Sequence, residues 1–270
     1  MHGSNTKGVC RKLPAHRRMI CDLMGLSRKI PTIPVARTMR VAAAAAARES
    51  CPVRPTWTSL FIKAYAIVCQ RNPRFRQLLM TFPWEYLYEH PISLCQVAIE
   101  RDVAGERVLL PAQLRSPDRQ PLAQINDYLR HCKVAPVREI GYFRQVFDGG
   151  RLPKPVRSVL WWMIFNLSGF RRAKHLGTFG VTSYGRLGAE QIHPLGPQTT
   201  VLTFGPISAT GEVVAKIIYD HRVLDGAEVA RRLAELEVTL NTEIVAELKQ
   251  LSTSSPDARD VGAAPARSAA

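Results

Sequence analysis

The chain is 270 residues long, and its apolar fraction of 46% and charged fraction of 22% are ordinary for a globular protein. This length allows a large buried core in one or two domains. Lysine and arginine number 37 against 22 aspartate and glutamate residues, which gives a formal net charge of +15. Such a charge favours anionic partners, namely nucleic acid, anionic lipid or a phosphorylated carrier, or it serves solubility alone.

Cysteine and histidine usage excludes several classes of protein. The six cysteines are widely spaced and form no C-x-x-C pair, so we expect reduced thiols in a cytoplasmic setting rather than a disulfide-stapled domain. The histidines form no cluster, so no metal site is expected. No stretch reaches the roughly 20 apolar residues that cross a bilayer. The longest, Val159 to Leu167, is interrupted by Asn166.

The first part of the chain is predicted to be mostly helical. Residues 1–14 are polar, basic and aperiodic, which predicts a flexible arm. Helices are predicted over Arg17–Met24, Met39–Arg48 and Thr58–Gln70, with an extended segment over Ile30–Pro34. The second helix contains six consecutive alanines, and the third has apolar residues at helical spacing.

A period of two residues begins after Pro91 and predicts β-strands. Ser93–Glu100 and Arg107–Leu114 are predicted to pair across a turn at Ala104-Gly105. A short helix is predicted next, over Pro121–Cys132. Three further strands are predicted over Thr178–Ser183, Thr199–Phe204 and Glu212–Tyr219, and the last two form a hairpin.

The clearest predicted helix runs from Ala227 to Leu251. Its apolar stripe consists of Val229, Leu233, Leu236, Leu240, Ile244 and Leu248. Residues 252–270 are rich in Ser, Ala, Pro and Gly, which predicts a disordered tail. Because helices and strands alternate without an internal repeat, we expect one α/β domain over residues 15–251.

A histidine lies where the last predicted strand meets this helix. Tyr219-Asp220-His221 ends the strand and Asp225-Gly226 opens the helix, which puts His221 at the rim of the sheet. An imidazole with an ordinary pKa near 6.5 can take a proton from a thiol or alcohol at neutral pH. Asp225 with Glu228 three residues later is a capping pattern, in which the carboxylate accepts a backbone N–H. The spacing alone also allows an alternative to a catalytic role, in which Asp225 only caps the helix and His221 is a structural residue.

Three segments together resemble a known family. Residues 220–227 (DHRVLDGA) look like the signature of the acyltransferase component of 2-oxo acid dehydrogenase complexes, which is similar in fold to chloramphenicol acetyltransferase. The glycine-bracketed segment 177–185 (GTFGVTSYG) resembles the strand that precedes the histidine in that family, and residues 17–24 (RRMICDLM) resemble its opening helix. The likeness runs from Arg17 to Leu251, and the connection 148–176 departs from it. It implies a mixed β-sheet flanked by helices.

The resemblance also implies roles for individual residues. His221 would be the general base of an acyl transfer from a thioester, carried by coenzyme A or an acyl carrier, to a thiol, hydroxyl or amine. Thr182 matches the hydroxyl residue that donates a hydrogen bond to the oxyanion. The alternative is that Thr182 is an ordinary strand residue without a catalytic role. If the match between the two sequences is shifted by one residue, Ser183 takes the role instead. Asp225 would hold the histidine loop, through an ion pair with Arg17. No covalently bound cofactor is implied.

The departures from the family shape the expected assembly. The dehydrogenase acyltransferases carry lipoyl and partner-binding domains that this chain has no room for, so we expect the donor to arrive from solution or on a separate carrier. Related condensation enzymes join two such folds in one chain, whereas this chain has one copy. A homotrimer, or a larger assembly of trimers, is therefore the expected way to complete the site.

The segment Arg157–Lys174 is the other departure. On a helix, Val159, Leu160, Met163, Ile164 and Leu167 would form a core face, and Trp161, Trp162 and Phe165 would fall largely outside it. Aromatic residues between basic ends favour contact with a membrane surface or a long acyl chain. Burial by another subunit is the alternative.

Other functions stay open at this point. A non-catalytic scaffold could retain the fold, and a lipid-directed acyltransferase could work at a membrane surface. A nucleic-acid binder is favoured by charge alone, and no recognition motif supports it, so no nucleic-acid partner is expected.

Overall fold

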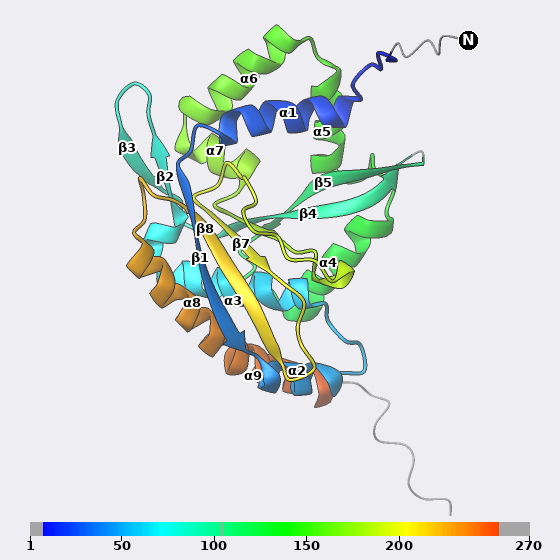
Figure 1. Ribbon diagram of the computed structural model, residues 1–270, viewed down its shortest axis with the longest axis vertical. Helices are drawn as coiled ribbons and strands as arrows, with labels where there is room; N and C mark the ends of the chain where they lie inside the picture. Colours follow the sequence, from blue (N-terminus) through cyan, green and yellow to red (C-terminus); the bar gives the residue numbers. More distant parts are fainter. Residues whose placement is uncertain (1–7, 104, 254–270) are drawn as a thin grey trace, which may run out of the picture.

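A six-stranded mixed β-sheet forms the frame of the molecule, with its strands in the order β1-β8-β7-β6-β4-β5 (Figure 1). The computed structural model describes residues 8–103 and 105–253. Strand β6 pairs in parallel with β4 and β7, and the other neighbours in this sheet are antiparallel. The strands are β1 Thr32–Arg40, β4 Leu94–Val103, β5 Glu106–Arg115, β6 Phe179–Thr182, β7 Thr200–Phe204 and β8 Glu212–Asp220, and a separate hairpin pairs β2 Gln77–Met80 with β3 Tyr86–Glu89.

One face of the sheet packs on the main hydrophobic core. Most of the helical part of this core comes from α2 Ala42–Glu49, α3 Trp57–Arg71, α4 Leu122–Val134, α8 Gly226–Asn241 and α9 Glu243–Thr253, and Phe143 adds to it from the segment after α4. Phe61 of α3 stacks on Phe204 with ring centroids 4.0 Å apart, and Tyr65 meets Phe179 edge-on at 5.0 Å. Because α3 is apolar and buried nearly all round, it is the central helix of the core.

The opposite face of the sheet is covered by a thinner layer. Helices α1 Ala15–Ser27, α5 Gly141–Arg151 and α6 Lys154–Asn166 lie over part of it, and a cavity separates them from β4, β5 and β6. Helix α7 Gly169–Leu176 packs between α6 and the β2–β3 hairpin. Two short 3-10 helices, η1 Pro73–Arg76 and η2 Gly185–Leu187, complete the connections.

The predicted α/β class, the mixed sheet and most of the predicted elements are confirmed. The two strand pairs have the expected antiparallel registers, Val103 opposite Glu106 and Phe204 opposite Ala215. Gly105 of the first turn has a φ of 80°, and Ala104 lies outside the described residues. The stripe of the last predicted helix is buried as expected.

Other predictions about the elements were wrong. The alanine helix starts at Ala42 rather than Met39, because β1 continues its pairing with β8 as far as Arg40 opposite Glu212. The helix predicted over 227–251 is two helices, α8 and α9. At the break, both the N–H and the hydroxyl of Thr242 donate to the carbonyl of Val238, and such local bonds compete with the regular ladder.

The sequence did not predict β2, β3, α5 or α7. Residues 8–14 have no regular secondary structure and are exposed, and α9 reaches Thr253, so the rest of both predicted tails lies outside the described residues. All six cysteines are free. No helix in the described ranges is long and apolar enough to cross a membrane.

Candidate active site

His221 follows β8 directly and is exposed at the rim of the sheet, as predicted. Its backbone N–H donates to the carbonyl of Pro31, 3.1 Å away, which ties the residue to the start of β1. Its Nδ1 lies 3.1 Å from the carbonyl oxygen of Leu224. Because a carbonyl only accepts, Nδ1 carries the proton in this contact, and the lone pair of Nε2 is left for another proton.

The loop that carries His221 is held by charged groups on both sides. Asp220 is buried, and its carboxylate accepts two bonds from the guanidinium of Arg222, at 2.9 and 2.7 Å, and one from the Arg222 backbone N–H at 3.1 Å. Hydrogen bonding to Asp220 raises the pKa of Arg222. Arg74 of η1 reaches the carbonyl of Val223 at 2.9 Å and the carboxylate of Glu228 at 2.5 Å.

Asp225 stands at the N-terminus of α8, but its side chain does not cap the helix. Its carbonyl accepts from Glu228 and Val229, while its carboxylate is exposed. Arg17 is exposed near the first turn of α1, whereas the loop at Pro31 follows the last turn, so about 15 Å of helix separates Arg17 from the His221 loop. The predicted ion pair between Arg17 and Asp225 is therefore not made within the described chain.

Thr182 is the last residue of β6 and is half-buried. Within the described residues its hydroxyl has no hydrogen-bond partner. The neighbouring Ser183 uses its hydroxyl for the fold, since it donates to the carbonyl of Phe204 at 2.8 Å and accepts from the N–H of Gly185 at 3.1 Å. Of these two hydroxyls, that of Thr182 is the one free to bind a ligand.

His221 and Thr182 lie at opposite ends of the sheet. Thr182 pairs with Thr203, which pairs in turn with Lys216 of β8. His221 comes five residues after Lys216, which is about 17 Å along the strand, and two inter-strand steps add about 10 Å across the sheet. One copy of the chain therefore does not bring the two side chains together.

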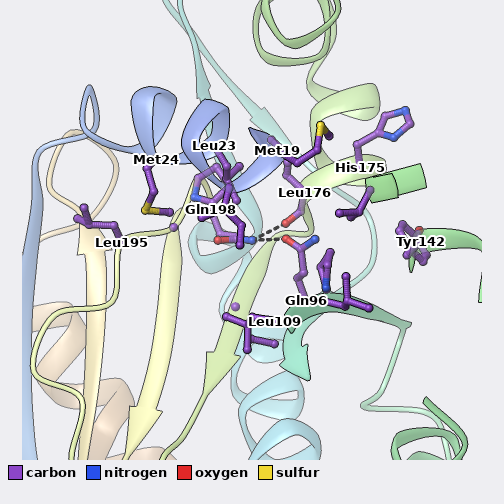
Figure 2. Close-up of a pocket in the computed structure, with 18 of the residues that line it drawn as sticks. Met19, Leu23, Met24, Gln96, Leu109, Tyr142, His175, Leu176, Leu195 and Gln198 are labelled. Carbon is purple, nitrogen blue, oxygen red and sulfur yellow. Dashed lines mark hydrogen bonds between the residues drawn. The ribbon is translucent and has the colours of Figure 1, made fainter. Parts of the chain in front are cut away.

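A cavity of about 490 Å³ borders Thr182 on the sheet face beneath α1, α5 and α6 (Figure 2). Gln96, Gly180 and Val201 form part of its floor, and Met19, Leu23 and Trp161 form part of its roof. The cavity has the size typical of small-molecule sites, roughly 300–1,000 Å³. His221 is not among its lining residues.

Comparison with solved structures gives consistent likenesses over nearly the whole chain. A probable dihydrolipoamide acetyltransferase from Listeria monocytogenes 4b F2365 is 18% identical with a TM-score of 0.62, covering 87% of this chain and 94% of that one. The cubic core of a pyruvate dehydrogenase multienzyme complex is 18% identical with a TM-score of 0.61, covering 90% and 96%. The dihydrolipoamide acetyltransferase of Azotobacter vinelandii is 17% identical with a TM-score of 0.60, covering 89% and 95%.

The chain has the dihydrolipoamide acetyltransferase fold. The predicted resemblance is thereby confirmed for the fold. No protein-family model matches the sequence, and no curated protein matches it.

The three aromatic residues of α6 lie in three different environments in this acetyltransferase fold. Trp161 lines the cavity, Phe165 lies under the guanidinium of Arg172 at 4.1 Å, and Trp162 is 46% exposed with its ring against Phe82. Burial lowers the pKa of Arg172 to about 10. The predicted core face was wrong: Val159, Leu160 and Leu167 are 58, 39 and 43% exposed, because α6 forms an outer layer rather than part of the main core.

Sequence reasoning missed the groups that hold the histidine loop. Arg222 is part of the motif DHRVLDGA, but the motif alone does not predict that its guanidinium binds Asp220 two residues earlier. Arg74 lies 149 residues before Val223, and no local pattern links the two. Within the described ranges, no group of three or more His, Cys, Asp or Glu side chains could hold a metal ion.

Proposed function

We propose that the protein is an acyltransferase that moves an acyl group from a thioester to a thiol, hydroxyl or amine, with each active site formed between two copies of the chain. His221 of one copy is the general base, and Thr182 of the next copy donates to the oxyanion.

The orientation of His221 is the observation that carries this proposal. The bond from Nδ1 to the Leu224 carbonyl fixes the tautomer, and the exposed Nε2 is left as a base. The loop is rigid because buried Asp220 accepts three hydrogen bonds from Arg222 and because Arg74 binds on the other side.

The proposed reaction is a nucleophilic acyl substitution. Nε2 of His221 takes the proton of the acceptor as the acceptor heteroatom bonds to the thioester carbon, and the carbonyl π electrons move to oxygen. The hydroxyl of Thr182 donates to this oxyanion, a contribution that is typically worth about 3 kcal/mol in such sites. The oxyanion then collapses, the carbon–sulfur bond breaks with its electrons on sulfur, and the imidazolium returns the proton to the thiolate.

The separation of the two side chains supports an assembly of copies. Within one chain they are too far apart to act on one substrate, so a cyclic trimer is the assembly we propose. The cubic core of the pyruvate dehydrogenase complex shares this fold. The Azotobacter vinelandii enzyme was studied for the roles of a serine, a histidine and an asparagine four residues further on in its catalytic mechanism. Here Asp225 stands four residues after His221, and its exposed carboxylate would hold the loop through a cation of a neighbouring copy.

Exposed cations near the histidine loop support a phosphorylated donor. Arg28 and Lys29 precede Pro31, the residue that binds the His221 backbone, and both are exposed without an acidic partner among the described residues. Phosphate groups of coenzyme A, or of the phosphopantetheine arm of a carrier protein, are the chemistry that such cations attract.

The test is a panel of acyl-coenzyme A donors with the release of free thiol as readout. His221→Ala should lower turnover by at least about a hundredfold, the usual effect of removing a general base, while the melting temperature stays near that of the wild type because the imidazole is exposed. His131→Ala, which removes an exposed histidine of α4, is the matched control. Turnover close to wild type in the His221 variant would remove this residue from the mechanism.

A further inference from the structure

The cavity beside Thr182 is lined mainly by apolar side chains. Its roof takes Met19, Ile20, Leu23 and Met24 from α1, Val146 from α5, and Leu160, Trp161 and Ile164 from α6. Figure 2 shows Met19, Leu23 and Met24 above the floor, with Leu109 on the side of the sheet. A volume of about 490 Å³ that apolar groups surround from three helices and a sheet suits a hydrocarbon.

The largest polar groups at the cavity are already engaged with the protein. The amide of Gln198 donates to Gln96 and to the carbonyl of Leu176, both at 2.6 Å, as the dashed lines in Figure 2 mark. Arg157 is buried and forms an ion pair with Asp22 at 2.6 Å. The charge of Arg157 is thus neutralised, and one polar group of each glutamine is engaged, which leaves the amide nitrogen of Gln96 and the amide oxygen of Gln198 without a partner among the described residues.

His175 is a further titratable group at the cavity, which Tyr142 and Tyr184 also line. Burial, with the nearby charges of Lys174 and Arg171, lowers its pKa, so its imidazole is neutral at neutral pH. The hydroxyl of Thr182 is a free hydrogen-bond donor at its end of a mainly apolar space, which Gln145, Tyr184 and Gln191 also border. A long acyl thioester needs a donor for its carbonyl and apolar walls for its tail, and Thr182 and the apolar side chains supply them.

We propose that this cavity binds the hydrocarbon tail of the acyl group, so that the donor is a medium- or long-chain acyl thioester with its carbonyl at Thr182. This inference rests on the proposed acyl transfer and names its substrate class. A methylene occupies about the volume of a water molecule, roughly 30 Å³, so a cavity of about 490 Å³ has room for a chain of at most about sixteen carbons.

Gly180 gives a direct way to test the proposal. It is buried in β6 on the cavity floor, and a Cβ built on it would meet its nearest neighbour, Cγ2 of Val201, at 3.4 Å, an ordinary van der Waals contact. Gly180→Leu therefore places a side chain in the cavity without forcing the backbone. Trp161→Ala does the opposite and enlarges the cavity from the roof. Val238→Leu, at an exposed position on α8, is the control.

The experiment measures kcat/KM for a series from acetyl- to arachidoyl-coenzyme A. For the wild type we expect a rise of about fourfold per added methylene until the cavity is full, the value for burial of a methylene group. Gly180→Leu should lower the palmitoyl-to-acetyl ratio by at least about tenfold, because its side chain takes the space of about four carbons. Trp161→Ala should move the optimum to longer chains, and Val238→Leu should keep the wild-type ratio.

A binding assay separates this inference from the proposed reaction. The probe is a dansyl-labelled undecanoic acid, whose fluorescence should rise on binding to the wild type and to Val238→Leu but not to Gly180→Leu. Binding with this pattern but without transfer would uphold the cavity and overturn the acyltransferase. Transfer that is indifferent to chain length, with no probe binding, would overturn the cavity and leave the acyltransferase standing. If Gly180→Leu fails to fold, an unchanged optimum in Trp161→Ala overturns the inference.

Discussion

Mixing two inactive variants tests whether the active site lies between copies of the chain. His221→Ala lacks the base and Thr182→Ala lacks the oxyanion donor, so each should retain about one hundredth of the wild-type activity or less. Within one copy the two residues are separated by about 17 Å along the strands and about 10 Å across them. If a working site joins His221 of one copy to Thr182 of the next, some mixed sites regain both groups.

The expected recovery follows from the geometry of a cyclic trimer. In an equal random mixture, a site works when its histidine comes from a Thr182→Ala copy and its threonine from a His221→Ala copy, so about one quarter of the sites are restored. Co-expressed subunits with two different affinity tags give a mixed population that can be purified and weighed by native mass spectrometry. Thiol release from an acyl-coenzyme A then measures the activity of that population.

Two outcomes would refute the reasoning. Mixed trimers that stay as inactive as either parent would place both residues in a site within one copy, and the separation derived from the strand register would then have to close by a large movement. A wild-type protein that is fully active as a monomer in light scattering would remove the need for a second copy.

Two further predictions follow from particular residues. Thr182→Ala should lower kcat by about a hundredfold with little change in KM, because the hydrogen bond from Thr182 to the oxyanion forms mainly in the transition state. Steady-state kinetics measure both constants, and a rise in KM alone would reassign Thr182 to substrate binding. Stability should fall as the pH drops below about 6.5, because burial lowers the pKa of His16 and His90 in the folded state and the unfolded chain then binds more protons. Thermal melts at neutral pH and near pH 5 measure this dependence of stability on pH. His90→Gln should make the dependence weaker. A melting temperature that is the same at both pH values would contradict the proposal that buried His16 and His90 cause it.

The part of the site around His221 could be predicted because it is local in sequence. A strand of period two, a histidine and the first turns of a helix of period 3.6 follow one another within about thirty residues, and the structure keeps all three, although the predicted helix breaks at Thr242. The position of Thr182 came from a glycine-bracketed strand, which is equally local. The alternative Ser183 could be set aside only with the structure, because its bond to the Phe204 carbonyl depends on the pairing of β6 with β7.

The cavity could not be predicted because it depends on contacts between distant segments. Its floor and roof come from four parts of the chain, and periodicity says which face of a helix is apolar but not what that face covers. For α6 the apolar pattern suggested a core face, whereas the residues over the cavity are Leu160, Trp161 and Ile164. The ion pair between Arg17 and Asp225 matches a family pattern, but within the described chain Arg17 lies near the start of α1 and Asp225 at the start of α8, and the two do not pair.

The two layers of helices differ sharply in how firmly they are held. Helix α3 buries ten of its residues, whereas α6 buries one, Arg157, which is tied to Asp22 of α1. Segments with so few buried contacts open locally at a small fraction of the global free energy of unfolding. Amide hydrogens of α6 should therefore exchange with solvent long before those of α3. Since α6 forms part of the cavity roof, a bulky guest can enter by fluctuation of this one helix while the sheet and its core stay intact.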